Sequence, residues 1–370
     1  MPACTSGMDY FATLPPFGHH LFHNVAIFFV RFIMKTMNIQ PRLSILIPSY
    51  NISKYVDEIL PTYAKEELVG KIKVFLIDDG STDDTAEKIA PWVQKYPNLF
   101  FYFHKENGGH GSVINYGLTL VDTPYFKVID GDDWTDSKEL STLLQALETL
   151  DADVFVTDYT EAYPDHQRRI VSYHEANDGR IYAPNAIYDE SILPHFTLGI
   201  HTLTFKTALW KENHLQVREH VYYEDTEYCA YPLRYAKRFV YVPCNVYFYR
   251  LGSQGQSVSL NSFIRHYADA LKVVHDLYEG YDELVTEKAD PAVLDAYAAI
   301  AAKFTFRETI FYPENKKMAR KTCLDLWKEM KKRPLIYQKV LHQSKTSRAL
   351  VFARFRCLGL FRKLIRKRAH

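Results

Sequence analysis

The chain has 370 residues, of which 47% are hydrophobic, and a formal net charge of +1. A chain of this length and apolar content can bury a large core, and we expect one large domain with a helical extension. The five cysteines are an odd number without metal-type pair spacing, so the sequence indicates neither a disulfide framework nor a zinc site.

Apolar strands alternate with helical patterns in the first part of the chain. The expected strands begin at Leu43, Val74, Leu99 and Tyr125. The helical patterns between them end near Leu68, Gln94 and Leu120. This alternation predicts a mostly parallel sheet, and ligands bind outside the carboxyl ends of the strands in such a sheet.

Three motifs follow these strands. They are Pro-Ser-Tyr-Asn at 48–51, Asp-Asp-Gly-Ser at 78–81 and Asp-Gly-Asp at 130–132. Because the carboxyl ends of parallel strands meet at one edge of a sheet, the three motifs can share one cleft. Two carboxylates two residues apart supply hard oxygen ligands, which suit Mg²⁺ or Mn²⁺ held together with substrate phosphates.

From about Leu43 to Ser259, this set of motifs resembles the family 2 glycosyltransferases. The resemblance implies an α/β fold, the nucleotide-sugar-binding fold called GT-A, with a mostly parallel central sheet flanked by helices. We therefore expect an N-terminal extension at 1–40, a catalytic domain at 41–260 and a C-terminal helical extension at 261–370.

The resemblance also implies roles for individual residues. The ring of Tyr50 is expected to pack on the nucleotide base, and Asp79 to contact the same base. Asp132 is the expected metal ligand, and Asp130 a ribose or second metal contact. The implied nucleotide-sugar-binding residues are Pro48, Tyr50, Asn51, Asp79, Asn107, Asp130 and Arg250.

Two later segments complete the implied site. In the Tyr-Glu-Asp-Thr segment at 223–226, Asp225 matches the catalytic base of the family. Arg250, with Ser253, Gln256 and Ser257, resembles a segment that often closes over the donor in the family.

The chemistry of sugar transfer explains these residue types without the resemblance. Breaking the anomeric C–O bond puts negative charge on the departing diphosphate, which Mn²⁺ or Mg²⁺ bound by Asp132 would stabilise. The incoming hydroxyl must lose a proton, so one carboxylate has to lie opposite the leaving group. Asp225 is the candidate, and a single base with in-line attack implies inversion without a covalent intermediate.

Each of these residues also has a purely structural interpretation. Tyr50 is alternatively an ordinary turn tyrosine, and Asp79 the start of an Asp-Gly turn. Glu224 and Asp225 also suit the first turn of a helix, where the helix dipole favours carboxylates. The functional interpretation is favoured because all the motifs occur together and in order.

The Gly-rich turn at 107–111 opens a helix, and such a turn can present backbone N–H groups to a phosphate. This helix has Ile114 where many family members carry Arg, which puts the diphosphate contact in doubt. Two interpretations stay open for His110, a donor or acceptor contact and a plain helix-start histidine. His201 lies where the family often lines the acceptor side, and the alternative for it is a core histidine.

Charge is unevenly distributed along the chain. From Lys316 to His370 there are 18 Lys and Arg and two acids, a net charge of +16. Within this tail, apolar residues recur at roughly helical spacing, at Leu350, Phe352, Phe355, Leu358, Phe361, Leu364 and Ile365. The pattern predicts a basic amphipathic helix at an anionic membrane surface.

This tail has two alternatives to a membrane surface. A helix packed on the acidic catalytic domain, with its basic face solvated, stays open. Nucleic acid is not an expected partner, because base stacking usually needs a strand platform rather than a Leu/Phe helix face.

The segment from Leu21 to Met34 is apolar but short for a membrane span. No Lys or Arg precedes it, so the basic start of a secretory signal is missing. Two interpretations stay open, a second interfacial segment and a stretch upstream of a true start at Met34 or Met37.

Together these patterns predict an inverting, metal-dependent glycosyltransferase. The expected donor is a nucleotide-diphosphate sugar, specifically a UDP-sugar, and the expected acceptor is a hydroxyl of a glycan or lipid-linked molecule in cell-surface glycan synthesis. The enzyme is expected to be cytoplasmic and peripheral at the inner face of the cell membrane. The Gln-x-x-Arg-Trp motif of processive synthases is missing, so transfer of one or a few sugars is expected.

Two other functions stay open. A sugar-nucleotide nucleotidyltransferase would share the metal carboxylate, but it should carry a Gly-rich phosphate loop and a Lys near the first strand. A non-catalytic nucleotide-sugar-binding or scaffold protein would keep the same acidic motifs. No motif identifies the sugar, the acceptor, the linkage or the oligomeric state.

Overall fold

A computed structural model describes residues 40–173, 187–188, 198–252, 260–305, 315–343 and 345–359. Pro41–His370 is one compact unit. The predictions for the N-terminal segment and for Ser253, Gln256 and Ser257 concern residues outside the described ranges. Among the described helices, none is both long and apolar enough to cross a bilayer.

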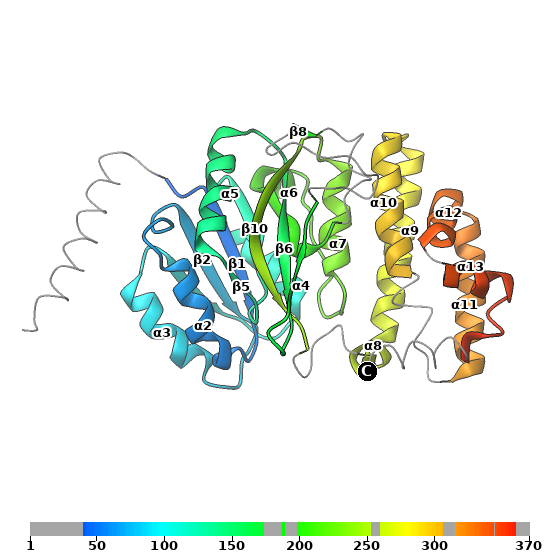
Figure 1. The fold of residues 1–370 in the computed structure, drawn as a ribbon, viewed down its shortest axis with the longest axis horizontal. Helices are drawn as coiled ribbons and strands as arrows, with labels where there is room; N and C mark the ends of the chain where they lie inside the picture. Colours follow the sequence, from blue (N-terminus) through cyan, green and yellow to red (C-terminus); the bar gives the residue numbers. More distant parts are fainter. Residues whose placement is uncertain are drawn as a thin grey trace, which may run out of the picture. The chain divides into compact units, whose positions relative to one another are not determined.

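Ten described strands form one sheet (Figure 1). They are β1 (Leu43–Ser49), β2 (Ile72–Asp78), β3 (Phe100–His104), β4 (Tyr125–Val128), β5 (Trp134–Thr135), β6 (Val154–Ala162), β7 (Arg168–Val171), β8 (Ile187–Tyr188), β9 (Leu203–Lys206) and β10 (Phe239–Arg250). The main path through the sheet is β3-β2-β1-β4-β9-β6-β10-β5.

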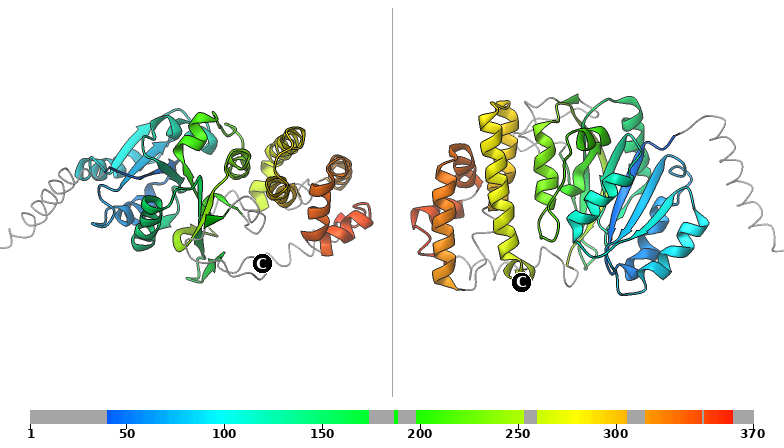
Figure 2. Two further views of the ribbon diagram at one scale, coloured as in Figure 1. Left: turned by 90° about the horizontal axis from the view of Figure 1, so that it is seen from above. Right: turned by 180° about the vertical axis from the view of Figure 1, so that it is seen from behind.

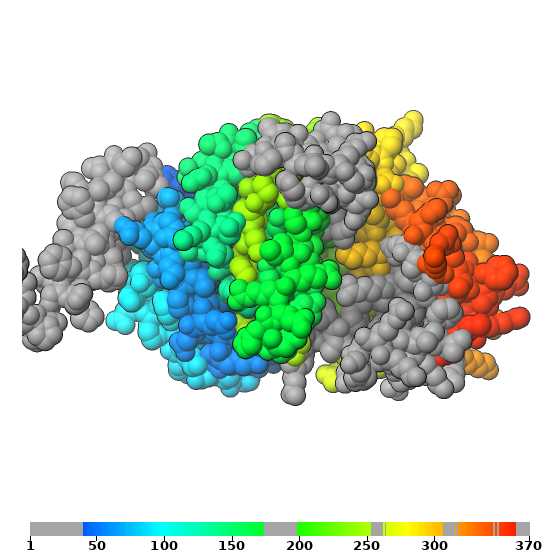
Figure 3. Space-filling model, viewed as in Figure 1, coloured from blue at the N-terminus to red at the C-terminus, as the bar shows by residue number. Residues whose placement is uncertain are grey.

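The strands β1 to β4 pair in parallel, as the sequence predicts. β6 and β10 are also parallel to each other, whereas β9 runs antiparallel between β4 and β6, and β5 runs antiparallel to β10. The expected mostly parallel α/β sheet is therefore confirmed, with short antiparallel strands in its second half. The edge strand β7 pairs with β6, is largely exposed and lies on the face shown in Figure 3.

The helices lie between and after these strands. They are α2 (Ser53–Tyr63), α3 (Thr85–Lys95), α4 (His110–Leu120), α5 (Ser137–Thr149), α6 (Thr207–Glu212), α7 (Asp225–Ala230), α8 (Leu260–Arg265), α9 (Tyr267–Thr286), α10 (Pro291–Phe304), α11 (Lys316–Lys331), α12 (Pro334–Gln343) and α13 (Lys345–Phe352), with 3-10 turns η2 (Ile200–Thr202) and η3 (Tyr231–Arg234).

The residue types explain where these elements begin and what they bury. β1 is a nearly continuous apolar run and is buried along its length, as expected of a parallel strand covered on both faces. α5 begins where the Asp136 carboxylate accepts hydrogen bonds from the backbone N–H of Lys138 and Glu139. α10 begins with Pro291 directly after the capping Asp290.

Two apolar clusters cover opposite faces of the sheet. One cluster contains the inward residues of α2 and α5, among them Val56, Leu60 and Leu143. The other contains residues of α4, α6, α7, α9 and α10, including Val113 and Trp210. In both views of Figure 2, α9 and α10 lie side by side, next to α7. The C-terminal helices thus extend the core that supports α7.

As far as residue 359, where the described part of the tail ends, it does not form one continuous amphipathic helix. α13 ends at Phe352, and the following Arg354 and Phe355 have left-handed φ values of 45° and 57°. An α-helix cannot continue through such residues. The prediction of one helix running on from Leu350 past Phe355 is therefore wrong.

Part of the predicted apolar stripe is buried inside the protein. Leu350, Phe355 and Leu358 form a small cluster with Ala319 and Cys323 of α11. These three residues therefore pack inside the protein, as the alternative expected, but against α11 and not against the part of the chain at 41–260. Phe352 is 92% exposed. Outside the described residues lie Phe361, Leu364 and Ile365.

Candidate functional site

The three sequence motifs lie at one edge of the sheet. In the parallel register, Ser49 at the end of β1 is level with Asp78 at the end of β2, and β4 pairs with the other side of β1. The loops that follow these strand ends carry Tyr50, Asp79 and Asp130. This is the carboxyl edge, where open α/β sheets bind ligands.

Asn51 joins the first two motifs. Its backbone N–H donates to Ser81 Oγ at 2.9 Å, and its Oδ1 accepts the N–H of Thr82 at 2.8 Å. These bonds hold Asn51 with a left-handed φ of 52°, which asparagine tolerates better than most residues. Tyr50 beside it is 53% exposed, so its ring is accessible at the edge of the sheet.

Pro48 touches the third motif through its backbone. A Cβ atom at position 131 would lie 2.4 Å from the Pro48 carbonyl oxygen, so only glycine fits there. The middle residue of the Asp-Gly-Asp motif is therefore fixed by the close approach of β1.

Asp79 is buried and holds the Gly-rich turn. Its carboxylate accepts hydrogen bonds from Lys105 Nζ at 2.7 Å and from the N–H groups of Gly108 at 2.9 Å and Gly109 at 2.8 Å. Asn107 Nδ2 donates to the Asp79 carbonyl at 2.8 Å. The N–H groups of Gly108 and Gly109, which the sequence suggested for a phosphate, are thus bonded to Asp79 within the protein.

His110, the first residue of α4, bridges two acidic residues. Its Nδ1 lies 2.6 Å from Glu224 Oε1, and its Nε2 lies 3.0 Å from Asp130 Oδ1. Burial disfavours the charged imidazole, but the hydrogen bonds to Asp130 and Glu224 outweigh it and raise the pKa of His110 well above its usual value. The bridge brings the third motif and the Glu-Asp segment to one place.

Asp225, the predicted base, is the first residue of α7 and is half-buried. Desolvation by the surrounding protein, followed by the charge of the neighbouring Glu224, raises the pKa of Asp225 to about 6. Charge on Asp130 acts in the same direction, while His110 lowers the pKa. A carboxylate with this pKa can accept a proton near neutral pH.

Asp130, Asp133 and His201 form a second group at this edge. Their ligand atoms all lie within 4.8 Å of one another. Burial lowers the pKa of His201 to about 4, so its imidazole is neutral at physiological pH. The sequence pointed to Asp130 and Asp132 as the metal pair. Asp132 does not belong to this three-residue group.

Arg250 connects the end of β10 to the third motif. Its Nε donates to the Asp132 carbonyl at 2.7 Å and its Nη2 to Glu58 at 2.8 Å. Its guanidinium lies 4.9 Å from the ring centroid of Tyr55 and 4.6 Å from that of Trp134. Arg250 therefore lies at the predicted edge with its guanidinium already engaged by protein groups.

Three buried residues at this site were not identified from the sequence. Asp133 accepts hydrogen bonds from Tyr247 Oη at 2.6 Å and the Arg250 N–H at 2.7 Å. Lys127 donates to the carbonyls of His201 at 2.8 Å and Leu203 at 3.1 Å. Two sequence signals were available, because Asp133 directly follows the Asp-Gly-Asp motif and Lys127 interrupts the apolar run at 125–129. No sequence pattern pointed to Tyr247.

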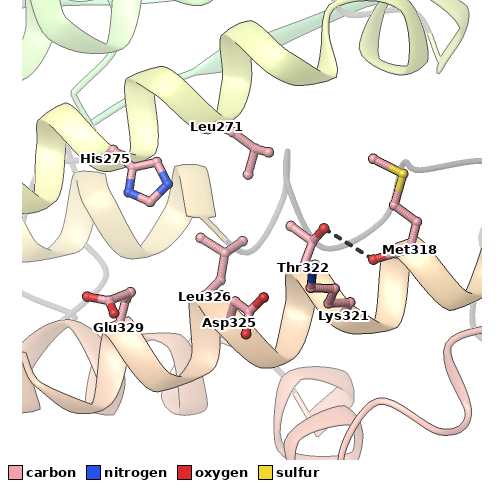
Figure 4. Close-up of a pocket in the computed structure, with 8 residues that line it drawn as sticks. All are labelled: Leu271, His275, Met318, Lys321, Thr322, Asp325, Leu326 and Glu329. Carbon is pink, nitrogen blue, oxygen red and sulfur yellow. Dashed lines mark hydrogen bonds between the residues drawn. The ribbon is translucent and has the colours of Figure 1, made fainter.

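A separate cavity of about 300 Å³ lies between α9 and α11 (Figure 4). Leu271 and His275 line it from α9, and Met318 and Leu326 from α11. It contains none of the predicted site residues, so it is not part of the site at the sheet edge.

The sequence is similar to those of known glycosyltransferases. Residues 44–212 match the family model described as glycosyl transferase family 2. An uncharacterized glycosyltransferase of Mycoplasma pneumoniae, the MG060 homolog, is 26% identical over 64% of this chain and 77% of its own length. The glycosyltransferase GlyG of Streptococcus pneumoniae is 32% identical, over 32% of this chain and 38% of its own length.

Solved structures share the fold. TarS 1-349 of S. aureus, determined in complex with UDP-GlcNAc, aligns with a TM-score of 0.60 at 19% identity over 88% of this chain and 92% of that chain. The mannosyltransferase PcManGT of Pyrobaculum calidifontis, with GDP-Man and Mn²⁺, aligns with a TM-score of 0.51 at 14% identity over 92% of this chain and 95% of its own. Residues 44–212 therefore match glycosyl transferase family 2, and the chain has the GT-A fold of these structures.

Proposed function

We propose that the protein is an inverting glycosyltransferase that moves a sugar from a nucleotide-diphosphate sugar to a hydroxyl acceptor. The observation that carries this proposal is Asp225, a half-buried carboxylate whose pKa is raised to about 6. It follows Glu224, which His110 connects to Asp130 at the carboxyl edge of the sheet. A proton acceptor thus lies beside the proposed donor site.

Asp225 acts as the general base in this proposal. It takes the proton from the acceptor hydroxyl as that oxygen attacks the anomeric carbon, and the diphosphate departs from the opposite side. The C–O bond to the acceptor forms while the C–O bond to the diphosphate breaks, so the configuration inverts. Tyr50 with its accessible ring face, Pro48, Asn51, Asp79, Asn107, Asp130 and Arg250 form the proposed nucleotide-sugar-binding set.

A divalent cation, Mn²⁺ or Mg²⁺, fits the chemistry of the acidic edge. Asp130 and Asp133 offer carboxylate oxygens and His201 an imidazole nitrogen, all within 4.8 Å. Carboxylate oxygens suit Mg²⁺ and Mn²⁺. We propose that Asp132 and Asp130 hold the ion, with Asp133 and His201 as the further donors. When bound, the ion would neutralise charge on the diphosphate leaving group.

A UDP-sugar is the proposed donor and a cell-surface glycan or its lipid-linked precursor the proposed acceptor. Two similarities support this choice. TarS binds UDP-GlcNAc in its crystal structure. The teichoic acid poly(glycerol phosphate) polymerase of Staphylococcus epidermidis is 23% identical over 62% of this chain and 33% of its own length.

Release of UDP from a panel of UDP-sugars with Mn²⁺, without added acceptor, tests the proposal. Slow donor hydrolysis by the wild-type protein, lost in Asp225→Asn, is the expected result. A nucleotidyltransferase would release product only with pyrophosphate or a nucleoside triphosphate. A binding or scaffold protein would bind UDP without turnover, so either result would reject the transferase.

We further propose that the enzyme works at the cytoplasmic face of a membrane, held by its basic C-terminal helices. Residues 315–359 carry 13 Lys and Arg and two acids. Phe352, at the end of α13, and Met318, on α11, are 92% and 60% exposed, respectively, and both lie among these basic residues. Positive charge with exposed apolar side chains is typical of binding to anionic lipid surfaces.

A further inference from the structure

His110 connects three segments that are far apart in the sequence. It begins α4, and its ring nitrogens lie 2.6 Å from Glu224 Oε1 and 3.0 Å from Asp130 Oδ1. One contact spans 114 residues of sequence and the other 20. A single imidazole therefore ties the segment before α7 to the loop after β4.

Burial makes the contact with Glu224 important. The Glu224 side chain is 5% exposed, against 28% for His110 and 30% for Asp130. Among the described residues, His110 is the hydrogen-bond partner of the Glu224 carboxylate. Removing the partner of a buried carboxylate leaves an uncompensated charge, so the segment would have to move or take up a proton.

The backbone before Glu224 is in an unfavourable conformation. Tyr223 has a φ of 74°, a value that residues other than glycine rarely adopt. Such a conformation persists only where surrounding contacts enforce it. His110 is hydrogen-bonded to Glu224, the residue between Tyr223 and Asp225.

The backbone of the Gly-rich turn docks on the same segment. The His220 N–H donates to the Gly108 carbonyl at 2.7 Å. A Cβ atom at position 111 would lie 1.9 Å from the Arg218 carbonyl oxygen, so the two backbones are in direct contact. These contacts place the segment 218–225 against α4, and the imidazole supplies the side-chain link.

We propose that His110 is a positioning residue that fixes the Glu224–Asp225 segment relative to Asp130. This inference rests on the proposed function, in which Asp225 is the base. Misplacing a catalytic group by about 1 Å can cost on the order of 10²-fold in rate. Loss of the bridge should therefore lower kcat on this scale and leave the KM for the donor nearly unchanged.

Three substitutions at His110 separate the two halves of the bridge. His110→Ala removes both contacts. The amide nitrogen of His110→Asn lies near the place of Nδ1 and can still donate to Glu224, whereas that of His110→Gln lies near the place of Nε2 and can still donate to Asp130. We expect kcat to fall about 10²-fold in the His110→Ala and His110→Gln variants and to be partly restored in the His110→Asn variant.

Two controls separate this role from a general loss of structure. His104→Gln removes a histidine that lies 3.3 Å from Asp78 and takes no part in the bridge, so it should keep wild-type kcat. In the Asp225→Asn background, His110→Ala should cause little further loss, because it acts through Asp225.

The outcomes distinguish this inference from the proposed function. If the wild type releases no UDP from any donor, the proposed function itself fails. If the wild type is active and the His110→Ala variant keeps its kcat, the positioning role is overturned. The role is also overturned if His110→Gln restores activity better than His110→Asn. A raised KM with unchanged kcat would instead make His110 a donor-binding residue.

Discussion

Gly111 lies so close to Arg218 that a Cβ atom at position 111 would stand 1.9 Å from the Arg218 carbonyl oxygen. No side chain can be accommodated at that distance, so α4 or the segment 218–225 must move in any variant. The glycines of the turn at 107–111 thus serve close packing between two segments of the protein. Their backbone N–H groups at 108 and 109 bind Asp79.

Gly111→Ala should therefore lower both stability and turnover. Forcing an extra carbon into a packed contact costs typically about 1–3 kcal/mol, although alanine favours the helix. Thermal unfolding and UDP release measure the two effects. Thr119→Ala, an exposed change on the same helix, is the control and should leave both close to wild type. A Gly111→Ala protein with wild-type Tm and kcat would contradict the close contact.

The pH dependence of turnover should follow Asp225. Its pKa is raised to about 6, so the base is protonated and inactive below that pH. We expect kcat to fall about tenfold per pH unit on the acid side of pH 6 and to stay nearly level just above it. In Asp225→Asn, kcat should fall by roughly 10²–10⁴-fold, while UDP affinity changes little. If the fall of kcat on the acid side occurred at the same pH in the variant as in the wild type, the base would be another residue.

Asp225 should also affect stability, with a definite sign. A carboxyl group whose pKa is higher in the folded than in the unfolded state lowers the folding stability once it ionises. This loss of stability is absent below the unfolded-state pKa near 3.8 and complete above about pH 6. Asp225→Asn should consequently raise Tm at pH 8 and leave it nearly unchanged at pH 3.5. A lower Tm of the variant at pH 8 would argue against a desolvated carboxylate at this position.

Asp132→Ala should abolish stimulation of UDP release by Mn²⁺ while the protein stays folded. The contrasting variant is Asp136→Ala, which removes the cap of α5 and should cost about 1 kcal/mol of stability without changing the response to Mn²⁺. Titrating Mn²⁺ against UDP release, with Tm measured in parallel, checks both. Full activity of Asp132→Ala, or of the wild type in EDTA, would reject the assignment.

Membrane binding should depend on Phe352 and weaken with salt. Phe352→Ser changes a residue that is 92% exposed, so Tm should stay within the usual range for surface changes. Co-sedimentation with anionic vesicles should fall, and raising salt should lower it for the wild type. Ile170→Ser, an exposed change on β7, is the control. Equal sedimentation of both variants and the wild type would exclude this surface.

Truncation after Thr346 is a less specific version of that experiment. It removes Leu350, Phe355 and Leu358, which are buried against α11. We expect a lower Tm as well as release from vesicles, with turnover on a soluble acceptor retained below the new Tm. A truncated protein with an unchanged Tm would contradict the packing of the tail on α11.

The sequence by itself determined the layout of the sheet edge. β1, β2 and β4 are apolar runs that end in the motifs at 48–51, 78–81 and 130–132, and the parallel pairing of these strands places the three motifs together. Local patterns suffice for this because strand period, turn chemistry and the direction of a parallel sheet are short-range properties.

Only the tertiary structure decided which side chains meet. The link from His110 to Glu224 spans 114 residues, and Asp133 meets Tyr247 across a similar separation, so no local period encodes either contact. The sequence suggested a phosphate for the N–H groups of the Gly-rich turn, and only the structure showed that those of Gly108 and Gly109 donate to the Asp79 carboxylate. The tail pattern predicted a membrane surface, but burying an apolar stripe is favourable against a protein core as well, and only the structure showed that Leu350, Phe355 and Leu358 pack on α11.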